Sequence, residues 1–240
     1  RVQWGRVWGG RMGMGEIGPG LSGGKNRETV TDSDRRGRDL FSKWCEHQGL
    51  TMGVDSMGNM FARREGTDPD ALPVMLGSHL DTQPTGGKYD GVLGVLGALE
   101  IVRTLNEAGV KTKHPIVVVN WTNEEGTRFA PAMMASGVFA GIHTLDWAYA
   151  RTDREGKSFG DELKRVGWVG DFFRSASMRE AVETAEARSE ELVGMIGLER
   201  YRDAPTSILS YGPQKLVALA AAVMPRPRLV VPAQPGAGAS

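Results

Sequence analysis

Two short apolar runs stand out along the chain, and a long segment with helical periodicity separates them. Residues 115–121 form a continuous apolar run, which is typical of a central strand in a parallel sheet, and residues 73–79 begin apolar and run into polar residues, which also predicts a strand. Between them, apolar residues recur on most sides of residues 91–108, which predicts a buried helix. A strand, a helix and a second strand at this spacing predict a βαβ unit and therefore an α/β fold.

Further elements are predicted outside this unit. We expect a strand over residues 59–63 and helices over residues 34–47, 131–139, 145–150, 160–166 and, with many charges, 178–196. A short Ala-rich apolar stretch covers residues 215–224, and the Pro-, Gly- and Ala-rich end at 225–240 is expected to be disordered. We see no internal repeat.

Glycine content divides the chain further. Residues 1–24 are rich in glycine, so we interpret them as a loop or a poorly ordered segment. The predicted strands and helices of the βαβ unit fall within residues 25–171, which we interpret as a catalytic domain. The composition changes after that point, and we treat residues 172–240 as a separate C-terminal segment.

Composition excludes several classes of partner. Lys and Arg together number 29, as do Asp and Glu, so the balanced charge gives no reason to expect nucleic acid or an anionic membrane as partner. No apolar run reaches the roughly 18 residues that a membrane span needs, and the start lacks the apolar core of a secretory signal. Cys45 is the only cysteine, which fits a reducing compartment. We therefore expect a cytoplasmic protein and, because the sequence begins with Arg, a fragment of a longer one.

The first cluster with candidate chemistry is His79-Leu80-Asp81, at the end of a predicted strand. Side chains alternate along a strand, so His79 and Asp81 point the same way. A histidine that ligates zinc usually donates its second ring N–H to a carboxylate, which fixes the orientation of the ring. The triplet therefore suits a metal ligand with its supporting residue, although a polar pair in a turn is the simpler alternative.

The second candidate is Asp90, which directly precedes the predicted helix over residues 91–108. An aspartate in this position is commonly an ordinary helix N-cap. The alternative is a carboxylate that bridges two metal ions, because such a bridge offsets the charge of both ions. Asp90 alone does not distinguish these possibilities.

The third cluster is Thr122-Asn123-Glu124-Glu125-Gly126, after the second predicted strand. Thr122 and Glu125 have the spacing of a capping box, but Gly126 argues against a helix that begins there. Adjacent carboxylates repel each other unless a cation lies between them. With a metal present, one glutamate can ligate it while the other accepts a proton from water.

These clusters follow the carboxyl ends of neighbouring predicted strands, where open α/β sheets bind their ligands. We therefore expect His79, Asp90 and Glu125 to converge, and the combination indicates metal-assisted hydrolysis. The other histidines are interpreted as structural or surface residues: His47, His114 and His143.

Two longer motifs resemble those of a known family. The stretches GSHLDTQPTGGKYDGVLGV (residues 77–95) and WTNEEGTRF (residues 121–129) resemble signatures of the hydantoinase/carbamoylase amidases. This group includes N-carbamoyl-L-amino-acid hydrolases, β-ureidopropionases and allantoate amidohydrolases, within the metal-dependent aminoacylase/carboxypeptidase superfamily. Weaker similarity starts near Gly18 and continues to Asp171.

The resemblance implies a three-layer catalytic domain like that of the zinc peptidases, with helices around a mixed βαβ-type sheet and a binuclear metal site. It implies that His79, Asp90 and Glu125 are metal ligands, with Asp90 bridging two divalent ions. It also implies that Glu124 is the general base and that Asp81 orients His79. In this family the ions are zinc, or manganese, cobalt or nickel.

The implied reaction is hydrolysis of a linear amide C–N bond, most like that of N-carbamoyl-L-amino acids, which releases the amino acid, carbon dioxide and ammonia in nitrogen metabolism. The implied partner is a small N-carbamoyl or ureido substrate, and members of the family are usually homodimers. Two alternatives within the superfamily are an allantoate amidohydrolase and a peptidase.

The sequence departs from the family after Asp171. A Glu-x-His-x-Glu-Gln-Gly type motif, the lid or dimerisation domain and a late ligand histidine are not found, and the last histidine is His143. We therefore expect an incomplete catalytic domain, truncated or altered at its C-terminal side, that is weakly active or inactive. A non-catalytic fragment with a partial metal site is the alternative from a different class.

Overall fold

The computed structural model describes residues 2–68, 70–170, 190–195 and 197–201. The chain forms two compact units, Arg1–Phe173 and Arg174–Ser240, and each is considered by itself. The described part of the second unit contains a short 3₁₀ helix, Glu199–Tyr201. Most of the predicted helix over 178–196 lies outside the described residues, as do the apolar stretch at 215–224 and the tail at 225–240.

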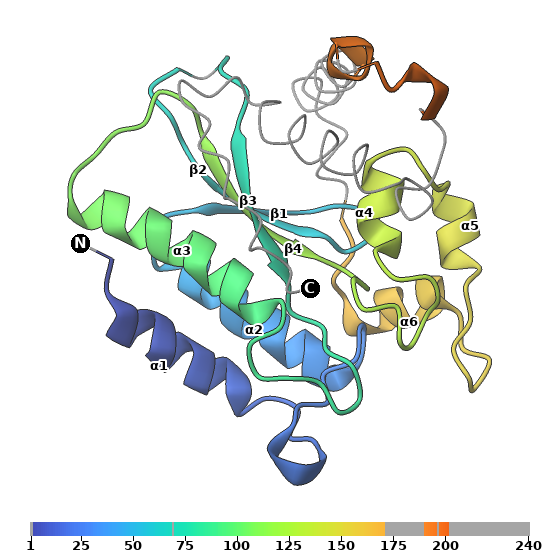
Figure 1. Cartoon of the computed structure of the whole chain (residues 1–240). Helices are drawn as coiled ribbons and strands as arrows, with labels where there is room; N and C mark the ends of the chain where they lie inside the picture. The colour runs from blue at the N-terminus through green and yellow to red at the C-terminus, as the bar shows by residue number, and fades with distance from the viewer. Residues whose placement is uncertain (1, 69, 171–189, 196, 202–240) are drawn as a thin grey trace, which may run out of the picture. The chain divides into compact units, whose positions relative to one another are not determined.

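The first unit is built on one mixed four-stranded sheet (Figure 1). Its strands are β1 (Thr51–Val54), β2 (Met60–Arg64), β3 (Val74–His79) and β4 (Ile116–Trp121), in the order β1-β2-β4-β3. β3 and β4 run parallel, whereas β2 is antiparallel to both β1 and β4. Helix α3 (Val92–Glu107) connects β3 to β4, so the predicted βαβ unit is confirmed.

Helices α2 (Asp32–Glu46) and α3 cover one face of the sheet, and α1 (Trp4–Gly15) packs on α3. Thr31 begins α2 by accepting a hydrogen bond from the main-chain N–H of Asp34. The two helices bury their apolar sides against the sheet, and this removal of apolar surface from water is the main stabilising contribution to the unit. The central buried residues of this layer are Phe41, Cys45, Met60, Leu96, Leu99 and Val118.

The opposite face of the sheet carries a smaller aromatic cluster. Phe61 of β2, Trp121 of β4 and Phe139 of α4 (Met134–Phe139) pack with ring centroids 5.1 to 5.9 Å apart. Helices α5 (Leu145–Tyr149) and α6 (Phe159–Val166) form a neighbouring core with the loop that follows β4. Helices therefore contact both faces, and the predicted α/β class with a mixed sheet is confirmed.

The interpretation of residues 1–24 as a loop was wrong for the part that forms α1. Glycines lower the helix propensity of this segment, but tertiary packing overrides propensity. Val7 and Met14 are buried, and Arg6 of α1 forms an ion pair with Glu100 of α3. The strand β1 was not predicted, because its four residues are stabilised by pairing with β2 rather than by a local pattern.

In the parts of the chain that the structure describes, every helix is too short or too polar to span a lipid bilayer.

Candidate metal centre

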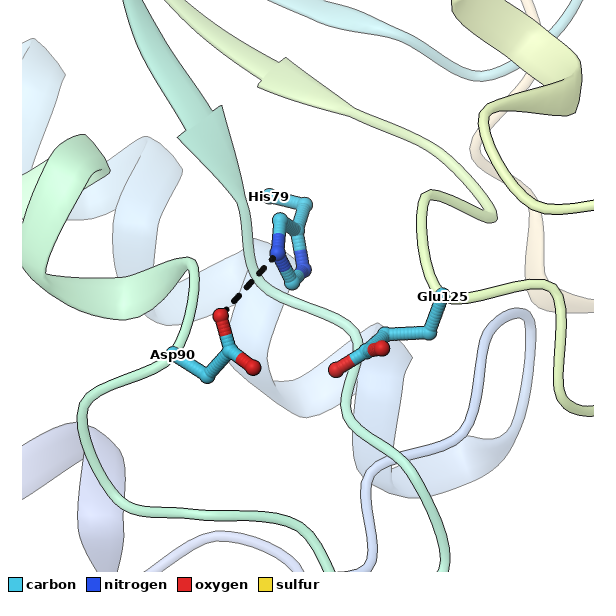
Figure 2. A group of neighbouring side chains, drawn as sticks. All are labelled: His79, Asp90 and Glu125. Carbon is cyan, nitrogen blue, oxygen red and sulfur yellow. Dashed lines mark ion pairs between the residues drawn. The ribbon is translucent and has the colours of Figure 1, made fainter. Parts of the chain in front are cut away.

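The parallel pairing of β3 with β4 brings the sequence clusters together. His79, the last residue of β3, lies opposite Trp121, the last residue of β4. Asp90 lies in the loop before α3, and Glu125 lies in the loop after β4. The three side chains face one small space (Figure 2), and each offers a ligand atom within 4.8 Å of the others. The predicted convergence is therefore confirmed.

The ring of His79 is oriented by the main chain of the same turn. Its Nδ1 lies 2.9 Å from the carbonyl oxygen of Asp81, which can only accept, so we assign the proton to Nδ1. Nε2 faces the acidic groups, 3.2 Å from Glu124 Oε2 and 3.8 Å from Asp90 Oδ1. His79 is thus buried, with Nδ1 held by the main chain and Nε2 directed at the carboxylates, where it would ligate a metal after losing its proton.

The carboxylate of Asp81 has a contact that the sequence did not reveal. It lies 3.6 Å from His79 Nδ1, but it also accepts the main-chain N–H groups of Glu124, at 3.3 Å, and Glu125, at 3.2 Å. Asn123 and Gly126 on either side have positive φ angles of 54° and 66°, and this tight turn presents both amides to Asp81. Asp81 therefore connects the histidine turn to the glutamate turn.

The two simpler interpretations of the acidic residues are not realised. The N-cap of α3 is Gly91, with no side-chain cap, so Asp90 is not the capping residue and its side chain is 63% exposed. No helix begins near Thr122, because α4 starts only at Met134. Glu125 is held instead by the side chain of Gln83, whose amide nitrogen donates to Oε2 at 3.0 Å.

The charges around His79 favour a cation in the shared space. Burial alone would lower the pKa of His79, but its contacts with Asp81 and the charge of Glu124 raise the pKa to about 9. Burial raises the pKa of Glu124, and the charges of Asp81, Glu125 and Asp90 act in the same direction, against His79. A divalent cation near Nε2 would relieve the repulsion among these carboxylates.

The donor set fits a divalent transition metal. One imidazole nitrogen and two carboxylates are common zinc ligands, and catalytic zinc sites typically combine three protein ligands with an open position. The same donors accept manganese, cobalt or nickel, so the residues do not select one ion.

Gly91 is required by the approach of the backbone to His79. Its φ is 64°, which L-residues with a side chain rarely adopt. A β-carbon at this position would lie 2.4 Å from the carbonyl oxygen of His79 and 2.5 Å from its ring Cε1. The residue between Asp90 and α3 therefore has to be glycine if His79 is to keep its position.

Histidine and carboxylates that meet at the strand ends of this mixed sheet form a candidate site for a divalent metal, at the edge where open α/β sheets bind their ligands. The chain belongs to peptidase family M20/M25/M40, whose model matches residues 75–236. Among curated relatives, it is 71% identical over 171 residues to the N-carbamoyl-L-amino-acid amidohydrolase of Rhizobium meliloti, which covers 71% of this chain and 41% of the relative. It is 43% identical over 166 residues to the enzyme of that name from Geobacillus stearothermophilus, covering 69% of this chain and 40% of the relative.

A solved structure supports the same assignment. The hydantoinase/carbamoylase family amidase of Burkholderia ambifaria superposes with a TM-score of 0.70 and 54% identity, covering 71% of this chain and 42% of that chain. The resemblance to this family is confirmed. The chain spans about two fifths of the length of these relatives. The family match runs to residue 236, beyond Asp171, where the recognisable motifs end. The domain boundaries expected at residues 24 and 171 stay predictions.

Proposed function

We propose that residues 75–170 carry one half of a binuclear metal centre for the hydrolysis of N-carbamoyl-L-amino acids. The observation that carries the proposal is the convergence of His79, Asp90 and Glu125 within 4.8 Å. The choice of substrate rests on the 71% identity to an N-carbamoyl-L-amino-acid amidohydrolase. Relatives named ureidoglycolate hydrolase and allantoate deiminase are less similar, at 36% and 37% identity.

In this proposal the residues have separate roles. His79 Nε2, Asp90 and Glu125 would hold the metal, and Asp90 would be the ligand shared with a second ion. Asp81 aims the ring of His79 and fixes the glutamate turn. A bound divalent ion supplies Lewis acidity, which polarises the substrate carbonyl and makes water more acidic.

Glu124 is the proposed general base. Its carboxylate lies beside the metal ligands, is about one third exposed and has a raised pKa because of burial and the neighbouring acids. A carboxylate with a raised pKa is a better acceptor for the proton of an attacking water. The same group can then return the proton to the nitrogen that leaves when the carbamoyl C–N bond breaks.

A second candidate function is a metal-binding fragment without catalysis. The chain spans about two fifths of its relatives, and only three ligands converge in the described residues. Three protein ligands suffice for one catalytic zinc but not for two well-held ions.

Metal content and turnover of the purified 240-residue chain test the metal site and show whether these residues catalyse the reaction by themselves. We expect one zinc or manganese ion at most per chain and no appreciable release of amino acid from an N-carbamoyl substrate. His79→Ala should remove the bound ion. His143→Ala is the matched control, because His143 stacks on Trp147 outside the cluster and should leave metal content unchanged. Two tightly bound ions with clear turnover would overturn this expectation.

Gly91→Ala tests the geometry of the site directly. We expect metal affinity to fall by about 10- to 100-fold, the usual effect of disturbing residues that support a ligand. The added methyl group forces His79 away and strains a backbone with positive φ. Gly97→Ala is the control, because nothing lies within 4 Å of its β-carbon position and alanine should stabilise α3 by about 0.5–1 kcal/mol. Calorimetric titration with zinc measures the metal affinity of the two variants. Equal affinities in Gly91→Ala and Gly97→Ala would contradict the placement of His79.

A further inference from the structure

Arg27 lies between helices α1 and α2, and its side chain reaches the end of strand β3. The residue is 1% exposed and is among the largest fully buried side chains of the chain. Its guanidinium donates three hydrogen bonds, all to main-chain carbonyl oxygens: from Nε to Leu80 at 2.7 Å, and from Nη1 to Met14 at 3.2 Å and Ile17 at 3.0 Å. Arg27 thus joins the end of α1 to the turn that follows β3.

The carbonyl of Leu80 is a sensitive point for the metal centre. Leu80 lies between His79 and Asp81, so its peptide unit fixes where both neighbours point. On one side, His79 Nδ1 bonds to the carbonyl of Asp81. On the other, the carboxylate of Asp81 holds the amides of Glu124 and Glu125. A shift of Leu80 would therefore reach every proposed site residue except Asp90.

A short main-chain pairing supports the same turn from the N-terminal segment. The N–H of Lys25 donates to the carbonyl of Gly86, and the N–H of Gly86 donates to the carbonyl of Lys25, both at 2.9 Å. The N–H of Thr82 donates to the carbonyl of Arg27 at 3.0 Å, and Thr82 Oγ1 accepts the N–H of Arg27 at 2.9 Å. The side chain and main chain of Arg27 therefore hold both sides of Asp81.

We infer that Arg27 is a positioning residue of the metal centre, which holds the Leu80 peptide so that His79 and Asp81 keep their orientation. Burying a guanidinium is costly unless it is well hydrogen-bonded. Burial lowers the pKa of Arg27, and the three carbonyls together with the negative charges of Asp34 and Asp81 offset part of that cost. A neutral side chain of similar length cannot supply three charge-assisted bonds. The effect on metal binding rests on the proposed function, whereas the effect on the turn does not.

A purely structural role for Arg27 would be to anchor α1. That anchoring has a second source, because Arg6 of α1 forms ion pairs with Glu100 and Glu107 of α3. A variant at Arg6 therefore loosens α1 without touching the Leu80 turn. This pair of arginines allows the two roles to be separated by experiment.

The test is amide hydrogen exchange of the metal-free 240-residue chain, resolved by residue, in Arg27→Gln and Arg6→Gln. For Arg27→Gln we expect at least about tenfold faster exchange at Thr82, Glu124 and Glu125, whose N–H groups depend on the turn. For Arg6→Gln we expect faster exchange within α1 and unchanged exchange at these three amides. Unchanged exchange at Glu124 and Glu125 in Arg27→Gln would overturn the inference.

A titration with Co²⁺ then connects the turn to the metal centre. Arg27→Gln should bind Co²⁺ about 10- to 100-fold more weakly than the unaltered chain, with Arg6→Gln unchanged. Arg27→Lys keeps the charge but loses the planar guanidinium with its several N–H donors, so its Co²⁺ affinity should lie between those of Arg27→Gln and the unaltered chain. It serves as the test variant if Arg27→Gln does not fold. If the unaltered chain does not bind Co²⁺, the proposed function fails, while the exchange result still decides the role of Arg27. Equal Co²⁺ affinity in all the variants would overturn the functional part of the inference.

Discussion

Replacing Glu124 with glutamine, in a complete relative that carries residues 75–170 of this chain, is expected to lower kcat by about 10²- to 10⁴-fold while metal stays bound. Glutamine keeps the shape of the side chain but cannot accept the proton of the attacking water. The metal should stay because Glu124 lies beside His79 Nε2, at 3.2 Å, without belonging to the group of three converging ligands.

Glu125→Gln is the matched variant and should behave differently. Glu125 belongs to the converging group, and its carboxylate is fixed by Gln83 at 3.0 Å. A neutral amide is a weaker ligand than a carboxylate, so metal affinity should fall together with turnover. Metal per chain after dialysis and kcat with an N-carbamoyl amino acid are the two measurements. Equal loss of metal in both variants would show that the roles are not divided in this way.

The predictable part of this molecule is the part whose signals are local. The apolar runs at residues 73–79 and 115–121 correspond to β3 and β4, and the periodic segment between them corresponds to α3. Because β3 and β4 are adjacent and parallel, polar residues after their carboxyl ends had to meet. The convergence of His79 with Glu125 follows from that topology rather than from the motifs alone.

The unpredicted part depends on contacts between distant segments. Helix α1 forms in a glycine-rich sequence because Val7 and Met14 are buried and Arg6 pairs with Glu100 of α3. The hydrogen bonds that Asp81 accepts from the main-chain N–H groups of two glutamates connect residues more than 40 positions apart. A single sequence carries no local signal for such pairs. The positive φ of Gly126 is the exception, because glycine is the residue that adopts this conformation most readily.

Arg128 also belongs to the recognised motif at residues 121–129, but the structure gives it a structural role. Its guanidinium donates to Asp153 and Glu162, and to the carbonyls of Thr29 and Val30. The side chains of the arginine and both acids are at most 12% exposed. Arg128 therefore ties the loop after β4 to α6 and to the segment before α2.

Arg128→Met is expected to lower the free energy of unfolding by about 3 kcal/mol, because it leaves two largely buried carboxylates without their shared cation. Lys157→Met is the control: the ion pair of Lys157 with Glu155 is exposed, and its loss should not change stability measurably. Urea unfolding followed by far-UV circular dichroism measures both. A similar small change in the two variants would contradict a stabilising role for the Arg128 cluster.

The difference between Arg128→Met and the unaltered chain should shrink in acid. Hydrogen bonds from Arg165 hold the pKa of Glu162 below its usual 4.5, and those from Arg128 add to the effect against burial. Burial opposes the shift at Asp153, but the N–H groups of Lys157 and Glu155 and the bond from Arg128 bring its pKa below 3.8. A carboxylate whose pKa is lower in the folded state than in the unfolded state stabilises the fold at pH values above its unfolded-state pKa. This contribution is lost as the pH falls through the folded-state pKa. Urea unfolding repeated from neutral pH to below pH 3.8 should therefore show the unaltered chain losing more stability than Arg128→Met. If the difference in free energy of unfolding between the unaltered chain and Arg128→Met stays constant over this pH range, Arg128 does not act through these two carboxylates.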